Sequence, residues 1–212
     1  MQSYTINSKY NNIIQLKVTP GHFATSSSHI NSFIDLSNLK AGCIEARAVA
    51  KAIMSERALA TKEIDTIICM DGTNVVGAYL AEEMSNSGIM SMNANKDINV
   101  VTPEQNSIGQ LTFRDNVVHT VYKKRVLLLL ATASTGRTVE KAVECIEYYG
   151  GSVEYISAIF TAADEIAGHQ INSIFHAADI DGYASYPSGS CPLCAGNIKL
   201  NGIVATNGIT QI

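Results

Sequence analysis

Short apolar runs alternate with helix-spaced segments through the middle of the chain. The runs are rich in Ile, Val and Leu and have the length of buried strands. The segments between them repeat their apolar residues at the spacing of a helix with one buried face. The expected strands are residues 64–70, 98–102, 125–131 and 153–160, and the expected helices are residues 42–57, 75–84 and 139–149.

This alternation of strand, turn and helix predicts an α/β fold with a mostly parallel sheet flanked by helices. Ligands of such sheets bind at the carboxyl ends of the strands, where residues 71–74 and 132–138 form polar turns. Asp115 and Asn116 interrupt the next apolar segment and predict a hairpin there. Residues 182–212 hold one charge, Lys199, so we expect short strands packed on the N-terminal segment or on a second subunit.

The amino-acid composition favours some classes of protein over others. The chain has 212 residues, of which 46% are hydrophobic and only 16% charged, against roughly 25% charged in an average domain. The low charge indicates a surface that is largely neutral or buried and so favours an oligomer, which we expect to be a homodimer. A net charge of −4 argues against a nucleic-acid binder. The sequence lacks a long apolar run and a signal-peptide core, so we expect a cytoplasmic protein without a membrane partner.

One turn combines features of a phosphate site. Residues 125–131 form the most apolar strand, and a helix is expected directly after the turn. Amides at a helix start and the helix dipole attract anions. Hydroxyls, a glycine and an arginine add donors, close approach and charge, although a tight βα turn with a Ser/Thr cap explains the same pattern. The candidate phosphate-binding residues are Thr132, Ala133, Ser134, Thr135, Gly136, Arg137 and Thr138.

Read whole, residues 126–138 resemble the PRPP-binding motif of type I phosphoribosyltransferases, in which this loop holds the sugar 5-phosphate. The turn Asp71, Gly72, Thr73 and Asn74 lies where that family carries its pyrophosphate loop. Residues 21–42 and 173–197 resemble the hood and the C-terminal end of proteins related to orotate phosphoribosyltransferase. The resemblance implies a single domain, residues 1–212, with a core over about 40–161 and a small hood from the two termini, 1–39 and 162–212.

The chain departs from this motif where the family carries its chemistry. Leu130 and Ala131 occupy the places of the two acids that receive the ribose hydroxyls. The stretch 103–116, which corresponds to the family's lysine-rich catalytic loop, contains no lysine, and its only base is Arg114. Asp71 would repel a pyrophosphate. No catalytic residue is therefore assigned.

Three functions stay open. The first is a protein that binds a phosphorylated ribose or a nucleotide and is catalytically impaired. The second is an active phosphoribosyltransferase of nucleotide synthesis or salvage, using Mg²⁺ with PRPP, in which Asp115 or Glu140 replaces the missing acids. The third is a structural dimer that binds no ligand.

Five cysteines form two groups. The odd total of five, in a sequence without an export signal, argues against a disulfide framework. Cys43, Cys69 and Cys145 lie in apolar patterns and are expected to fill the core. Cys191 and Cys194 have the spacing of half a tetrahedral zinc site in a loop, or are two reduced thiols in a turn. The other zinc ligands would come from a second subunit or from upstream residues. His22, His29 and His119 are expected to be structural or exposed, and His29 would face a base. The upstream candidates are His169, His176, Asp179 and Asp181.

Overall fold

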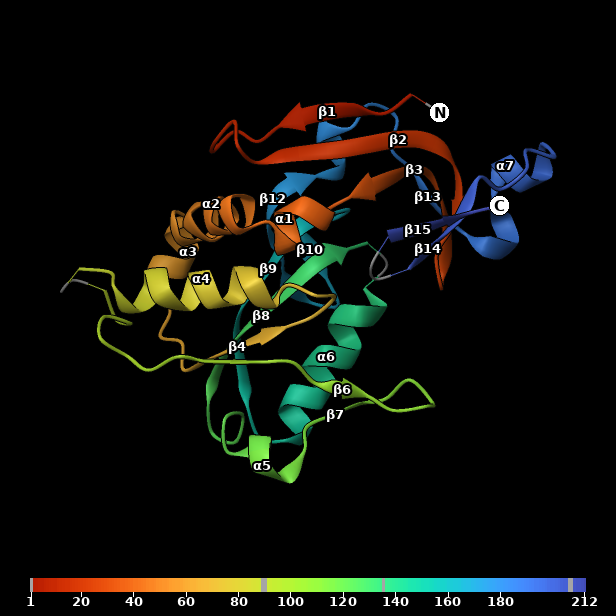
Figure 1. Cartoon of the computed structure of the whole chain (residues 1–212). Helices are drawn as coiled ribbons and strands as arrows, with labels where there is room; N and C mark the ends of the chain where they lie inside the picture. The colour runs from red at the N-terminus through yellow and green to blue at the C-terminus, as the bar shows by residue number, and fades with distance from the viewer. Residues whose placement is uncertain (1, 89–90, 135, 206–207) are drawn as a thin grey trace.

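A five-stranded sheet forms the centre of the fold, and every neighbouring pair of its strands is parallel (Figure 1). The computed structural model describes residues 2–88, 91–134, 136–205 and 208–212. The α/β class expected from the sequence is confirmed. In spatial order the strands are β12 (Asn172–His176), β9 (Ser152–Thr161), β8 (Arg125–Ala133), β4 (Thr66–Cys69) and β5 (Asn99–Val101).

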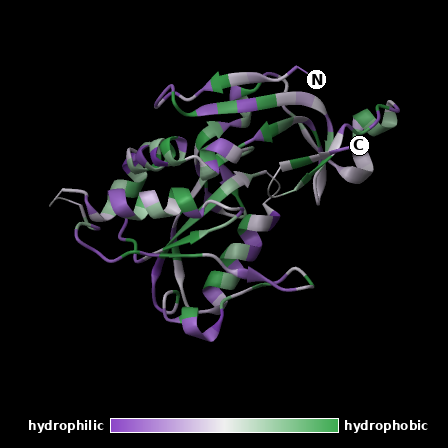
Figure 2. Cartoon of the chain, viewed as in Figure 1, coloured by the Kyte–Doolittle hydropathy of each residue, from purple (hydrophilic) through white to green (hydrophobic). Residues whose placement is uncertain are grey.

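Side chains of β8 alternate between two hydrophobic cores. Leu127 and Leu129 pack with α2 (Cys43–Met54) and α4 (Asn74–Ser85) on one face of the sheet. Leu128 and Leu130 pack with α6 (Arg137–Tyr148) on the other face. Figure 2 shows apolar and polar residues alternating along α6, whose buried side meets the sheet. Burial on both faces explains why this strand reads as a continuous apolar run.

A second sheet, the hood sheet, joins the two ends of the chain beside the core (Figure 1). The C-terminal strands pack on the N-terminal segment, because β13 pairs with β3 and β14 runs parallel to β2. The hood sheet consists of β1 (Tyr4–Asn7), β2 (Gln15–Ala24), β3 (Ser28–Asp35), β13 (Ser185–Pro187), β14 (Gly202–Ala205) and β15 (Gly208–Gln211).

Two expectations about the connections were wrong. The core extends past residue 161, because β12 pairs with β9 in the central sheet. The hairpin forms before Asp115 and not around it. Asn106 accepts backbone hydrogen bonds through its side chain, and Gly109 has φ +82°, so this turn folds the chain back. Asp115 instead begins a short helix. These elements are β6 (Glu104–Gln105), β7 (Leu111–Thr112) and α5 (Asp115–Val118).

The remaining elements are short. Cys191 and Cys194 do not lie in an irregular loop, because a one-turn helix starts at Pro192, which fits the first helical position. Cys43 is exposed and not core filler, whereas Cys69 and Cys145 are buried. None of the described helices combines the length and the apolar character needed to cross a membrane. The short elements are α1 (Ser37–Ala41), α3 (Arg57–Ala60), β10 (Glu165–Ile166), β11 (His169–Gln170), η1 (Ala177–Asp179), η2 (Ser188–Ser190) and α7 (Pro192–Ala195).

Candidate functional site

A cavity of about 400 Å³ lies between the carboxyl ends of the core strands and the hood sheet. Asp71 follows β4, and Thr132 to Ser134 close β8, so both polar turns contribute to the same wall. The turn between β2 and β3 contributes Thr25, Ser26 and Ser27. Residues far apart in the sequence therefore enclose a single polar cavity at the edge where parallel sheets bind ligands.

The candidate phosphate turn lies at this cavity. Thr132, Ala133, Ser134, Gly136 and Thr138 line it, whereas Thr135 lies outside the described residues. The strand is longer than expected, since β8 includes Thr132 and Ala133. The amides of Ser134, Gly136, Arg137 and Thr138 donate no backbone hydrogen bond to another described residue. The cavity-lining residues Ser134, Gly136 and Thr138 thus bring backbone donors and the start of the twelve-residue helix α6 to the cavity wall, a combination that suits an anion.

Gly136 is the residue that lets α6 start at this point. Its φ of +83° lies in the left-handed region, which only glycine adopts without strain. A Cβ atom added there would lie 2.8 Å from the Cγ2 atom of Ile166. The turn is therefore fitted closely against β10.

The two positions that replace the motif's acids differ in their surroundings. Leu130 is fully buried and packs in the core beneath α6. Ala131 is 4% exposed and lines the cavity. Neither side chain accepts a hydrogen bond, so neither can receive a ribose hydroxyl.

The other turn supplies a carboxylate and lies close to a cation. Asp71 has φ +54°, and the ammonium group of Lys40 donates a 2.8 Å hydrogen bond to its backbone carbonyl. Burial raises the pKa of the Asp71 carboxyl, and Lys40 opposes that shift. Burial lowers the pKa of Lys40, which Asp71 and Asp35 oppose. All three side chains line the cavity.

The rest of this turn is structural. The Thr73 hydroxyl is buried and donates to the carbonyl oxygens of Met70 (2.8 Å) and Leu129 (3.2 Å), which joins the ends of β4 and β8. The Asn74 side chain donates to the Thr102 hydroxyl at 2.6 Å. Of the four residues Asp71 to Asn74, Asp71 alone lines the cavity.

Other candidate charges lie away from the cavity. Arg137, Asp115 and Glu140 do not line it. Arg114 binds the Glu104 carboxylate across the β6–β7 hairpin, with nitrogen–oxygen distances of 2.6 and 2.8 Å. Lys40 is the cation that the sequence analysis missed. A lysine in a short helix has no local pattern that marks it, and only the fold brings it to residue 71.

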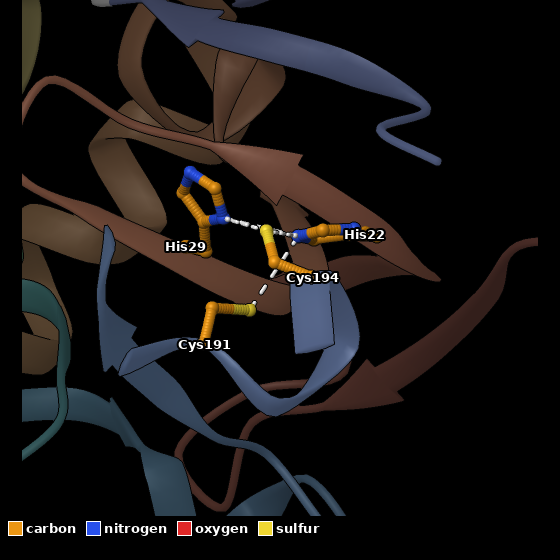
Figure 3. Close-up of side chains that lie close together, drawn as sticks. All are labelled: His22, His29, Cys191 and Cys194. Carbon is orange, nitrogen blue, oxygen red and sulfur yellow. Dashed lines mark hydrogen bonds between the residues drawn. The ribbon is translucent and has the colours of Figure 1, made fainter. Parts of the chain in front are cut away.

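A cluster of potential metal ligands lies in the hood. His22, His29, Cys191 and Cys194 each point one ligand atom toward a common centre, and these atoms lie within 4.8 Å of one another (Figure 3). No other described residues form such a cluster of three or more. All five cysteines are free.

The side chains that meet the cysteine pair are not those expected from the sequence. His176 lies 3.3 Å from the Asp164 carboxylate, and Asp179 accepts the His176 backbone amide. His169 and Asp181 lie outside the cluster as well. The two histidines judged structural or exposed are the ones that meet the cysteine pair. Their separation of seven residues matches no helical ligand spacing, and the hydroxyl-rich turn between them was the available signal of a hairpin.

Solved structures share this fold. Orotate phosphoribosyltransferase of Mycobacterium tuberculosis, in complex with Fe(III) dicitrate, aligns with a TM-score of 0.52 at 18% identity, covering 77% of this chain and 91% of that one. A phosphoribosyltransferase from Corynebacterium diphtheriae gives 0.53 at 18% identity, covering 76% and 89%. Adenine phosphoribosyltransferase from Thermoanaerobacter pseudethanolicus gives 0.50 at 16% identity, covering 68% and 88%.

These alignments confirm the type I phosphoribosyltransferase fold that the sequence resemblance implied. The M. tuberculosis enzyme has also been solved with PRPP and with inorganic phosphate. Neither a protein-family model nor a curated protein sequence matches the chain.

Proposed function

We propose that this phosphoribosyltransferase-fold protein binds a phosphorylated ribose or a nucleotide in the cavity between core and hood. The supporting observation is the turn at the start of α6, which lines that cavity together with Lys40 and whose described amides donate no hydrogen bond to another described backbone group. The amides and the Ser134 and Thr138 hydroxyls would hold a phosphate, and Lys40 would add charge. One protein of similar fold, the M. tuberculosis orotate phosphoribosyltransferase, has been solved with PRPP and with inorganic phosphate, which supports a ligand of this chemical class.

We further propose that transfer of phosphoribose is impaired. Leu130 and Ala131 offer no carboxylate to a ribose hydroxyl or to a cationic sugar transition state. Leaving a buried hydroxyl unpaired costs about 1–3 kcal/mol. The β6–β7 hairpin has no lysine to neutralise a leaving pyrophosphate, and its Arg114 is already paired with Glu104.

The alternative is an active transferase with a rebuilt site that uses Mg²⁺ with PRPP. The observation in its favour is that Asp35 and Asp71 both line the cavity, which gives two carboxylates near Lys40. They replace Asp115 and Glu140 as the candidates for the missing acids. The two functions differ in whether Mg²⁺ and PRPP are needed.

A ligand panel separates these functions. Thermal unfolding is followed with ribose 5-phosphate, nucleoside monophosphates and PRPP, each with and without Mg²⁺. A monophosphate at 100 times its Kd stabilises the fold by about 2.7 kcal/mol. We expect that stabilisation without Mg²⁺, and no pyrophosphate release from PRPP with orotate or adenine. Mg-PRPP as the sole stabilising ligand, with turnover, would favour the active enzyme.

Two lysine variants test whether the phosphate binds in this cavity. Lys40→Met is expected to weaken phosphate affinity roughly tenfold, because it removes a charged hydrogen-bond donor. Lys141→Met, on the exposed side of α6, is the matched control and should leave affinity unchanged. If no ligand of the panel stabilises the wild-type chain, the structural dimer is the function that remains. Measuring the mass of the protein in solution then tests whether it is a dimer.

A further inference from the structure

We propose that His22, His29, Cys191 and Cys194 bind one zinc ion that joins the two terminal segments of the hood. The inference is independent of the phosphate site. It comes from four side chains supplied by three separate places in the sequence: strand β2, strand β3 and the start of α7 (Figure 3).

Four of the six distances between ligand atoms are close to those of a tetrahedral site, and all six are within 4.8 Å. Zinc at its usual bond lengths places two nitrogens about 3.3 Å apart, and a nitrogen and a sulfur about 3.6 Å apart. His22 Nε2 and His29 Nδ1 are 3.1 Å apart. Cys194 Sγ lies 3.7 Å from His22 Nε2 and 3.3 Å from His29 Nδ1. Cys191 Sγ lies 3.5 Å from His22 Nε2.

A hydrogen bond on the far side of His22 fixes the correct nitrogen for metal binding. Nδ1 of His22 lies 2.7 Å from the carbonyl oxygen of Ile198, which can only accept, so Nδ1 carries the proton. The other nitrogen, Nε2, therefore presents its lone pair to the cluster. Metal-bound histidines are commonly held in this way, with the second nitrogen donating to a carbonyl or carboxylate.

The backbone around His22 is built to aim this side chain. The β2–β3 pairing shifts register between Pro20 and Phe23, so Gly21 and His22 form a bulge. The bulge turns His22 inward beside Phe23, and both residues are fully buried or nearly so. Asn201 then holds the strand: its side chain accepts the His22 amide at 2.8 Å, and its amide donates to the His22 carbonyl at 2.7 Å.

The donor set selects the metal and its role. Two thiolates and two imidazoles in a tetrahedron suit zinc, and four protein ligands leave no position for a substrate or water. The ion would therefore be structural. Binding replaces the protons of the two thiols, so two protons leave as Zn²⁺ binds. Thiol oxidation is not required, and all four side chains keep their covalent structure.

The hood has a physical need for such a site. Leu16 and Val18 of β2 pack in the main core, but the end of the hood that carries the cluster has a separate core with three described buried side chains: Phe23, Ile30 and Phe33. A core of this size contributes little stability, and small units of this kind are commonly held together by metals or disulfides. The proposed ion would fix α7 and the chain up to β14 onto the β2–β3 hairpin.

Metal content tests the proposal. Protein purified without chelator and measured by elemental analysis should hold about one zinc ion per chain. His29→Ala and Cys194→Ser should hold roughly tenfold less. The matched controls are His119→Ala and Cys43→Ser, which alter an exposed histidine and an exposed cysteine outside the cluster and should retain the ion.

Two further measurements keep the test decisive if a variant folds poorly. His29→Cys should retain zinc, because His29 uses its nearer nitrogen and a thiolate has a similar reach. Cobalt exchanged into the wild-type chain should show the absorption of a tetrahedral ion with thiolate ligands, and Cys194→Ser should weaken the thiolate band. Wild-type protein without zinc or cobalt binding would overturn the proposal. So would a Cys191–Cys194 disulfide in the purified chain, or zinc that persists in His29→Ala.

Discussion

Asp71 places a negative charge in a cavity that we propose to bind phosphate. Its left-handed backbone, at φ +54°, favours residues such as Asp, Asn and Gly. Its carboxyl is half-buried and lies near Lys40, yet burial outweighs that attraction and raises its pKa. The charged form of Asp71 therefore opposes both folding and anion binding.

Asp71→Asn should increase the free energy of unfolding near neutral pH. The raised pKa means that the folded state holds this proton more tightly than the unfolded state, whose pKa is close to 3.8. Ionisation therefore destabilises the wild-type fold as the pH rises from 3.8 through the folded pKa. Urea unfolding of both proteins across this range measures the difference between their free energies of unfolding. That difference should shrink as the pH falls and become constant below pH 3.8.

The same variant should tighten binding of ribose 5-phosphate by roughly 1 kcal/mol, or about fivefold, because one repulsive charge is removed. Titration calorimetry near neutral pH measures this change. A stability difference that does not vary with pH would contradict the raised pKa, whereas unchanged affinity would place the phosphate away from residue 71.

Only some of the residues that line the cavity could be predicted from the sequence. The turn after β8 was found because its hydroxyls and glycine follow a strand and precede a helix directly. Lys40 and Asp35 were missed because they reach the cavity through a different segment. Thr73 was grouped with the ligand-binding turn, but its hydroxyl is used within the core.

Among the elements, the unit of β8, turn and α6 depends on a single glycine. Gly136 combines a left-handed φ with a close approach to Ile166. Gly168 has a similar φ of +78° but has open space where a Cβ would lie. The pair separates the effect of backbone conformation from the effect of packing.

Gly168→Ala should destabilise the fold by about 1–2 kcal/mol, the usual cost of a left-handed alanine. Gly136→Ala should cost that amount plus about 1–3 kcal/mol for overpacking against Ile166. Denaturant unfolding measures both. In the double variant with Ile166→Ala, the two effects should be less than additive, and strict additivity would mean that the contact with Ile166 carries no energy.

Elements with long-range burial were the easiest to predict. The strand and helix pattern from β4 to β9 follows from apolar periodicity, because both faces of the sheet are covered. The β6–β7 hairpin was misplaced, since its position depends on the Asn106 side chain rather than on periodicity. The bulge at His22 could not be predicted, because it depends on pairing with β3.

At the scale of the whole molecule, the hood links the two candidate sites. The turn that carries Thr25, Ser26 and Ser27 lies between the two histidine strands and lines the cavity. Val204, Ala205 and Gly208 of the C-terminal strands line the same cavity. An ion that joins these segments would also hold one wall of the ligand site.

Removing zinc with a chelator should lower the Tm and weaken ribose 5-phosphate affinity together, because the hood wall loosens. Wild-type protein and Cys43→Ser should respond alike, and added zinc should restore both properties. If the Tm falls while affinity is unchanged, the metal site stands and the coupling is wrong. If the wild-type protein does not bind ribose 5-phosphate before the chelator is added, the proposed function is wrong whatever the outcome for the metal.

The parallel pairing of β14 with β2 joins two segments that are translated at very different times. Asn201, which holds His22 through two hydrogen bonds, is translated 179 residues after it. The last core strand, β12, ends at His176, so all core strands precede the residue that completes the support of the β2–β3 hairpin. A nascent chain that still lacks the segment from Asn201 onward would therefore be without the β14–β15 side of the cavity and without the two hydrogen bonds that hold His22.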